Sequence, residues 1–232
     1  WIHQQAQHLA VELRDRLGVR PGDRVALWLK NRPEFVPALY AVLLNGAVAV
    51  PINNFLKADE VNFILADASC QAMITDDTMG EGLEPLLLLR PQLQVWKVES
   101  FAGFRDTAPV TPLPASNRGT NDLAVIIYTS GTTGRPKGAM LSNGNLLHNV
   151  ESCREVLAAM DHDRCVVWLP LVHSFMLTVG VLLPTLVGGS LILIKSLHPP
   201  KAILDEVARG GGTILPAIPQ FFRALANAPV PD

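Results

Sequence analysis

YTSGTTGRPKG occupies residues 128–138 and directly follows LAVII, an apolar run at residues 123–127. Such a run is typical of a buried strand, and the loop after it is rich in glycine and in hydroxyl side chains. Glycines let backbone N–H groups approach an anion closely, hydroxyls donate hydrogen bonds, and Lys137 adds a compact positive charge. We therefore expect this loop to bind a polyphosphate.

Two other phosphate-binding patterns do not fit the loop. A Walker A loop needs Gly-Lys followed by Ser or Thr, whereas here Pro136 precedes Lys137 and Gly138 follows it. The dinucleotide fingerprint needs a third glycine at a spacing that Gly131 and Gly134 do not complete. A flexible surface turn of small residues is the alternative interpretation.

The composition limits the class of protein. The chain has 232 residues, 49% of them hydrophobic, which is enough for one large or two modest domains. Its 19 Lys and Arg nearly balance its 21 Asp and Glu, so we expect no nucleic-acid partner. The three cysteines, Cys70, Cys153 and Cys165, include no Cys-x-x-Cys pair, so neither a disulfide framework nor a zinc site is expected. A reducing, cytoplasmic location fits best.

The most apolar stretch covers residues 175–187 and is interrupted by Pro184. A membrane-spanning helix needs about 20 apolar residues, so we expect a buried helix here and no transmembrane segment. The chain opens with Trp-Ile-His, which is neither an initiator methionine nor a signal peptide. We expect it to begin inside a longer protein.

Helical and strand patterns alternate along the chain. Helices are expected at residues 1–17, 34–45, 57–66, 84–89, 143–159, 201–209 and 220–227. Strands are expected at residues 24–29, 47–50, 72–75, 93–98, 123–128, 165–169, 190–194 and 213–215. This alternation predicts an α/β fold with mostly parallel sheets covered by helices, and residues 99–120 read as a long surface loop.

The loop at residues 128–138 resembles the phosphate-binding loop of the AMP-forming adenylate synthetases, which include the acyl- and aryl-CoA synthetases. The resemblance continues through GDRVA at residues 22–26, NRPEF at 31–35, GAVAVPIN at 46–53 and LPLVHSF at 169–175. It implies two α/β subdomains, residues 23–158 with the phosphate loop and residues 164–232. Residues 1–22 would form a helix that joins the second subdomain.

The resemblance also implies a reaction. A small-molecule carboxylic acid attacks the α-phosphate of ATP, with Mg²⁺, to give an acyl-AMP and pyrophosphate, and the acyl group then passes to coenzyme A. The residues implied to cradle the β- and γ-phosphates are Thr129, Ser130, Gly131, Thr132, Thr133 and Gly134, with Thr129 and Thr133 in direct contact. Lys137 would add positive charge, and a solvated lysine at the loop exit is its alternative role.

His173 is the second candidate, in the segment PLVHSF. The resemblance puts this position near the acyl carboxylate and the approaching thiol, and a hydrogen-bonded histidine at a strand end is the alternative. Phe175, Met176 and Gly180 would line an acyl tunnel or else form ordinary core. Asp76 and Asp77 follow a strand, and we expect solvated turn residues there and not a magnesium site.

The substrate class follows from a missing charge. An amino-acid substrate needs a carboxylate partner for its buried ammonium group, and residues 172–175 contain no acid. A fatty or aryl acid therefore fits better.

The family's adenine, ribose and magnesium contacts and its catalytic lysine come in later segments that are not found before Asp232. We expect an N-terminal portion that does not complete adenylation alone. A ligase that loads a carrier protein and a non-catalytic nucleotide- or acyl-binding module remain alternatives.

Overall fold

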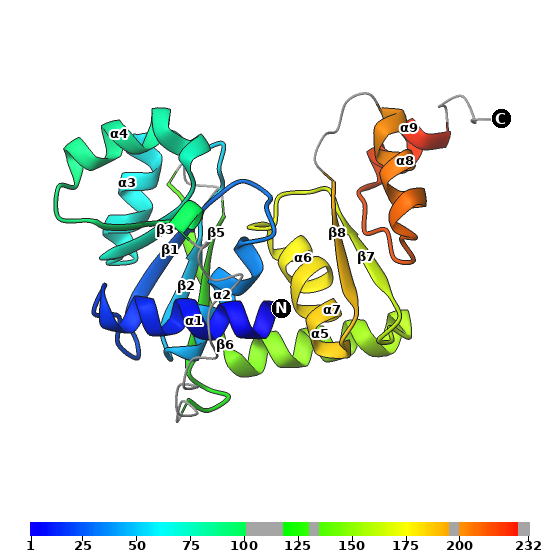
Figure 1. Cartoon of the computed structure of the whole chain (residues 1–232), viewed down its shortest axis with the longest axis horizontal. Coiled ribbons are helices and arrows are strands. Elements are labelled where there is room, and N and C mark those ends of the chain that lie inside the picture. The colour runs from blue at the N-terminus through cyan, green and yellow to red at the C-terminus, as the bar shows by residue number, and fades with distance from the viewer. Residues whose placement is uncertain (101–117, 130–134, 195–199, 227–232) are drawn as a thin grey trace. The chain divides into compact units, whose positions relative to one another are not determined.

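The computed structural model describes residues 1–100, 118–129, 135–194 and 200–226 (Figure 1). The chain forms two compact units, Trp1–Leu146 and Leu147–Asp232. Both units combine helices with parallel strands, which confirms the predicted α/β class. The division falls inside helix α5 (Asn143–Leu157), whereas the resemblance put the boundary between residues 158 and 164.

A six-stranded sheet with the order β4-β3-β1-β2-β5-β6 forms the centre of the first unit. Its strands are β1 (Arg24–Trp28), β2 (Val48–Pro51), β3 (Ala72–Thr75), β4 (Gln94–Lys97), β5 (Leu123–Thr129) and β6 (Lys137–Ser142). All neighbouring pairs are parallel except β5 and β6, which are antiparallel. The carboxyl ends of the five parallel strands therefore share one edge, and the phosphate loop begins at that edge.

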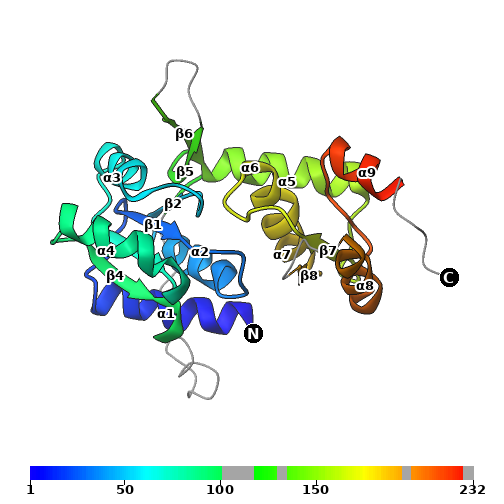
Figure 2. The ribbon, with the colours of Figure 1, turned by 90° about the horizontal axis from the view of Figure 1, so that it is seen from above.

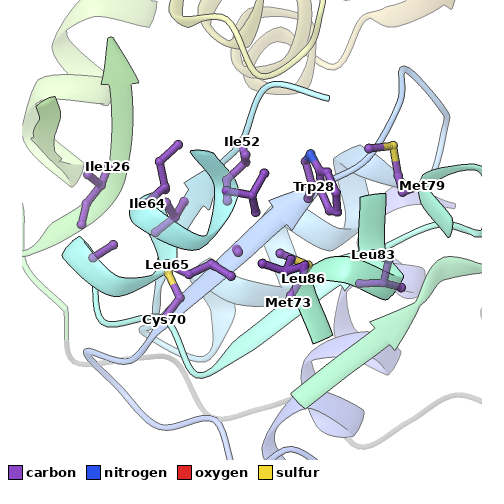
Figure 3. Close-up of a cluster of buried hydrophobic side chains, with 14 of the residues drawn as sticks. Trp28, Ile52, Ile64, Leu65, Cys70, Met73, Met79, Leu83, Leu86 and Ile126 are labelled. Atoms are coloured by element: carbon purple, nitrogen blue, oxygen red, sulfur yellow. The ribbon is translucent and has the colours of Figure 1, made fainter. Parts of the chain in front are cut away.

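The central strands are buried along their whole length because helices cover both faces. Helices α3 (Ala58–Asp67) and α4 (Gly80–Leu89) cover one face, where a 3₁₀ turn, η1 (Asp77–Met79), leads into α4. Helix α2 (Phe35–Leu44) lies on the opposite face (Figure 2). Side chains from β1, β2, β3 and β5 meet those of α3 and α4 in one apolar cluster (Figure 3). The strand that leads into the phosphate loop, β5, is thus packed against an apolar core.

Helix α1 (Ile2–Asp15) packs against α2 in the first unit. Its buried face is made of Ala6, Leu9, Ala10 and Leu13, and the side-chain amide of Asn45 donates to the carbonyl of Ala10 at 2.8 Å. This packing differs from the expectation that residues 1–22 join the second subdomain, because the apolar stripe of α1 is covered by α2. Gly18, three residues after the end of α1, has a left-handed φ of 64°, a conformation that glycine adopts readily.

The second unit contains a two-stranded parallel sheet, β7 (Arg164–Val167) and β8 (Ser190–Leu193). Residues 213–215, expected as a strand, contribute only an isolated bridge from Ile214 to Cys165. Helices α8 (Pro200–Gly210) and α9 (Pro219–Ala226) follow β8. Val166 and Ile203 lie in the small core of this unit, where the Trp168 ring stacks on Phe221 with centroids 4.1 Å apart.

The single buried helix expected at residues 175–187 is wrong in detail. The segment consists of α6 (Ser174–Met176), a π-helix η3 (Leu177–Leu182) and α7 (Leu183–Val187). Pro184 has no N–H to continue a regular helix, and the Thr185 hydroxyl donates to the carbonyls of Val181 and Leu182. The expected burial is confirmed for Met176, Leu177 and residues 179–184, whereas Phe175 at the start of the segment is 41% exposed.

Strand β6 is an element that the sequence patterns did not predict. Its residues are mostly exposed or half-buried and show no apolar alternation. It forms because β5 offers an unpaired edge, against which Lys137–Ser142 pairs in antiparallel register, with one register shift between Leu123 and Val125.

Candidate functional site

The described part of the phosphate loop is its root, formed by the antiparallel β5–β6 ladder. Thr129 is the last residue of β5, Lys137 is the first of β6, and the two are direct cross-strand partners. Both side chains are exposed. Ser130, Gly131, Thr132, Thr133 and Gly134 lie outside the described residues. The structure therefore brings two of the seven expected phosphate-binding residues together at one end of a ladder.

The residue before Thr129 is anchored to another element. The Tyr128 hydroxyl donates a hydrogen bond of 2.5 Å to Oδ2 of Asp67, the last residue of α3. Burial and this hydrogen bond both raise the pKa of Tyr128, so the phenol stays protonated and remains a donor. The sequence analysis missed Asp67, because no local pattern links residues 61 positions apart.

The far end of β6 is fixed by a helix cap. The Ser142 hydroxyl accepts a hydrogen bond from the backbone N–H of Asn145 at 3.2 Å, and Asn145 Oδ1 accepts one from the N–H of Ser142 at 2.9 Å. This reciprocal arrangement satisfies donors at the start of α5. Ser142 thus caps the start of α5. The strand that leaves the loop is held at both ends.

His173 lies in the second unit, at the N-cap of α6, and its side chain is exposed. Its Nδ1 accepts a hydrogen bond from the backbone N–H of Phe175 at 3.3 Å. An accepting Nδ1 leaves the proton of the neutral ring on Nε2. The ring is thus oriented by its own helix, with one edge engaged in capping.

The three other residues considered for an acyl tunnel fall into two groups. Phe175 is exposed, whereas Met176 and Gly180 are buried in the second unit. A Cβ at Gly180 would lie 2.4 Å from Met176 Sδ and 3.1 Å from Val167 Cγ2. Met176 and Gly180 therefore pack against each other and against β7, as in ordinary core.

Asp76 and Asp77 differ sharply in environment. Asp76 is fully buried and accepts hydrogen bonds from the N–H of Lys30 and from both the N–H and the hydroxyl of Thr78. The expectation of a solvated Asp76 is thus wrong, because the loops after β1 and β3 close over it. Asp77 is exposed and pairs with Lys97 at 2.7 Å. Both carboxylates already have partners.

The described residues contain no group of three or more His, Cys, Asp or Glu side chains able to hold a metal ion. In the same part of the chain, no helix has both the length and the apolar character needed to cross a membrane. At the root of the loop, Thr129 supplies a hydroxyl and Lys137 an ammonium group on neighbouring strands, and this pair suits an anionic ligand.

The sequence model of the family described as AMP-binding enzyme matches residues 2–232. The chain belongs to this family. Among curated relatives of this AMP-binding enzyme chain, feruloyl-CoA synthase from Amycolatopsis sp. is 37% identical over 91% of the chain and 42% of the relative. A long-chain-fatty-acid–CoA ligase, FadD13, from Mycobacterium tuberculosis is 33% identical over 93% of the chain and 44% of the relative.

The fold of this AMP-binding chain is similar to that of solved enzymes. ATP-bound MatB from Rhodopseudomonas palustris aligns with a TM-score of 0.85 and 29% identity, over 98% of this chain and 45% of that one. The chain thus spans less than half the length of the curated relatives that it matches. The resemblance to the adenylate-forming enzymes, inferred from the loop motif, is confirmed.

Proposed function

We propose that this chain forms the N-terminal portion of an AMP-forming acid–thiol ligase of the acyl-CoA synthetase type. A carboxylate oxygen attacks the α-phosphorus of ATP, which forms an acyl-AMP and releases pyrophosphate. The thiol of coenzyme A then attacks the acyl carbon and releases AMP. The observation that carries the proposal is the family match over residues 2–232, together with the exposed Thr129–Lys137 pair at the root of the loop.

The loop residues Thr129, Ser130, Gly131, Thr132, Thr133 and Gly134 would bind the β- and γ-phosphates through N–H and O–H donors. Lys137 would neutralise charge that builds up on the leaving pyrophosphate. Because the reaction brings two anions together, positioning and charge neutralisation are the main contributions expected from the protein. Mg²⁺ would arrive with the nucleotide, because this ion is commonly held by substrate phosphates together with few protein ligands.

His173 would lie near the acyl carboxylate and the approaching thiol. Its exposed ring and its orientation by the Phe175 N–H support a role in contacting substrate. The absence of an acidic residue at positions 172–175 supports a fatty or aryl acid without an amine. The names of the feruloyl and long-chain fatty-acid relatives agree with this class.

The three cysteines are free, which agrees with the proposed cytoplasmic location of the protein. The expectation that the segment alone does not complete adenylation stays a prediction.

The test is acid-dependent formation of AMP by the full protein, measured with ATP, Mg²⁺, coenzyme A and a panel that includes ferulate and long-chain fatty acids. Thr129→Ala and Thr133→Ala should each lower the rate at least tenfold, as expected for the loss of a donor to transition-state charge, roughly 10²-fold in favourable cases. Thr120→Ala, an exposed threonine of the same unit, is the matched control and should leave the rate unchanged.

Other outcomes separate the alternatives. AMP formation that needs a carrier protein and ignores coenzyme A would indicate the carrier-loading ligase. ATP binding without AMP formation from any acid would indicate a binding module. Unchanged kinetics in both loop variants would remove the loop from the mechanism.

A further inference from the structure

Tyr128 joins two elements that are distant in the sequence. It stands beside Thr129 in β5, and its hydroxyl donates to Asp67 at the carboxyl-terminal end of α3. Its side chain is half-buried and packs against the apolar cluster of the first unit. The position of β5 at the loop root is therefore tied to α3 through one side chain.

The same ring also contacts β6. Gly138 is the cross-strand partner of Tyr128, and a Cβ at Gly138 would lie 3.1 Å from Tyr128 Cζ and 2.7 Å from Ile126 Cγ2. A Cβ here would be too close to Ile126 and tight against the Tyr128 ring, so glycine leaves room for both side chains. Tyr128 is thus held by Asp67 at its hydroxyl and by the β6 backbone along its ring.

Strand β6 depends on this contact because it is the edge strand of the described sheet, with β5 as its neighbour. Its first residue, Lys137, is paired with Thr129 at the end of the ladder, one position beyond the Tyr128–Gly138 pair. Terminal pairs of a ladder fray most easily, so the pair next to them has the largest effect on their geometry.

We propose that Tyr128 is a positioning residue for the phosphate site. Its bond to Asp67 and its packing on Gly138 hold Thr129 and Lys137 in the register that binds the phosphates of ATP. The inference rests on the proposed function of that pair. Because the pKa of Tyr128 is raised, the phenol keeps its donor proton at neutral and moderately alkaline pH.

The experiment removes each partner of the hydrogen bond. Tyr128→Phe keeps the ring and deletes the donor, Asp67→Ala deletes the acceptor, and a double variant combines both changes. Asp67→Asn keeps an acceptor oxygen and should restore the bond. Tyr40→Phe is the matched control, because Tyr40 is the only other tyrosine of the chain.

Two measurements are made on each variant. Hydrogen exchange of the backbone amides of residues 137–142 reports the stability of the ladder in this chain. The KM values for ATP and for the acid, measured on the full protein, report the site.

We expect Tyr128→Phe and Asp67→Ala each to speed hydrogen exchange in β6 and to raise the KM for ATP, both by about three- to tenfold, the value of one hydrogen bond. The KM for the acid should change little, which a general loss of stability would not reproduce. The double variant should be no worse than either single variant, and Asp67→Asn should resemble the wild type. Tyr40→Phe changes a tyrosine of α2 and should leave exchange in β6 and the KM for ATP unchanged.

Exchange at the wild-type rate in Tyr128→Phe would overturn the inference, as would faster exchange with an unchanged KM for ATP. Additive effects in the double variant would also contradict it, because they would show that the two groups act independently. A wild-type protein that forms no AMP would instead overturn the proposed function, while the exchange data would still decide whether Tyr128 holds the ladder.

Discussion

Thr129 and Lys137 are direct cross-strand partners at the open end of the β5–β6 ladder. Directly opposite residues of an antiparallel pair project on the same face, with Cβ atoms about 5 Å apart. The hydroxyl of Thr129, at the start of the glycine-rich loop, and the ammonium group of Lys137, at its end, are therefore neighbours. This juxtaposition makes separate predictions for the two residues and for the strands that hold them.

Lys137→Gln should raise the KM for ATP about tenfold in the full protein, because the variant loses a charge-assisted contact with phosphate. The KM for the acid should stay within twofold of the wild type. Lys97→Gln is the matched control, since Lys97 lies on β4 at the other edge of the sheet and pairs with Asp77. Equal, small effects of both substitutions would support the solvated role of Lys137.

Gly138→Ala should destabilise the first unit by about 1–2 kcal/mol, because the new Cβ would overpack against Ile126 and Tyr128. The measurement is the midpoint of urea unfolding, followed by circular dichroism. Gly80→Ala serves as the control, because a Cβ at Gly80 meets no atom within 4 Å and the position is helical. A Gly138→Ala variant as stable as Gly80→Ala would contradict the close packing at the root of the loop.

Asp76→Ala should cost about 2–3 kcal/mol, because it leaves the N–H groups of Lys30 and Thr78 without their acceptor. The loops after β1 and β3 would then lose a shared anchor. Asp77→Ala removes only an exposed ion pair with Lys97 and should cost at most about 0.5 kcal/mol. Chemical denaturation of the two variants gives their free energies of unfolding. Similar losses of stability in both would show that the buried hydrogen bonds of Asp76 stabilise the fold no more than the exposed ion pair of Asp77 does.

The stability of the fold should depend on pH in the alkaline range because of the buried thiol of Cys165. Burial raises the pKa of its thiol from 9.0 to about 11. Below pH 9 the thiol is protonated in both the folded and the unfolded chain, so it has no effect there. Between pH 9 and 11 only the unfolded chain ionises, and stability falls as pH rises, by about 1 kcal/mol at pH 10.

Cys165→Ala should therefore lose less stability between pH 8 and pH 10 than the wild type does. Thermal unfolding of both proteins at the two pH values measures this difference. An identical slope in Cys165→Ala would mean that the thiol ionises at its ordinary pKa in the folded protein.

Much of the local structure followed from the sequence. The strands at 72–75 and 123–129 agree with the apolar runs that predicted them, because such runs depend on neighbours in the chain. Strand β6 was not predicted, because its residues show no alternation of apolar and polar side chains and its conformation depends on pairing with the edge of β5. The π-helix was not predicted, because Pro184 changes the backbone hydrogen bonding of the turn before it.

The residues of YTSGTTGRPKG were enough to predict a phosphate-binding loop, because the chemistry of glycine, hydroxyl and lysine groups depends only on residue type and spacing. The adenylate-forming family followed from the resemblance of this run and of four other segments to that family. The order of strands, the packing of α1 on α2, the burial of Asp76 and the bond between Tyr128 and Asp67 were decided only by the tertiary structure. These contacts join residues far apart in the sequence, as in the Ala49–Val125 pair of β2 and β5 and the Tyr128–Asp67 hydrogen bond. Folding selects them by burial and hydrogen-bond satisfaction, which no local pattern records.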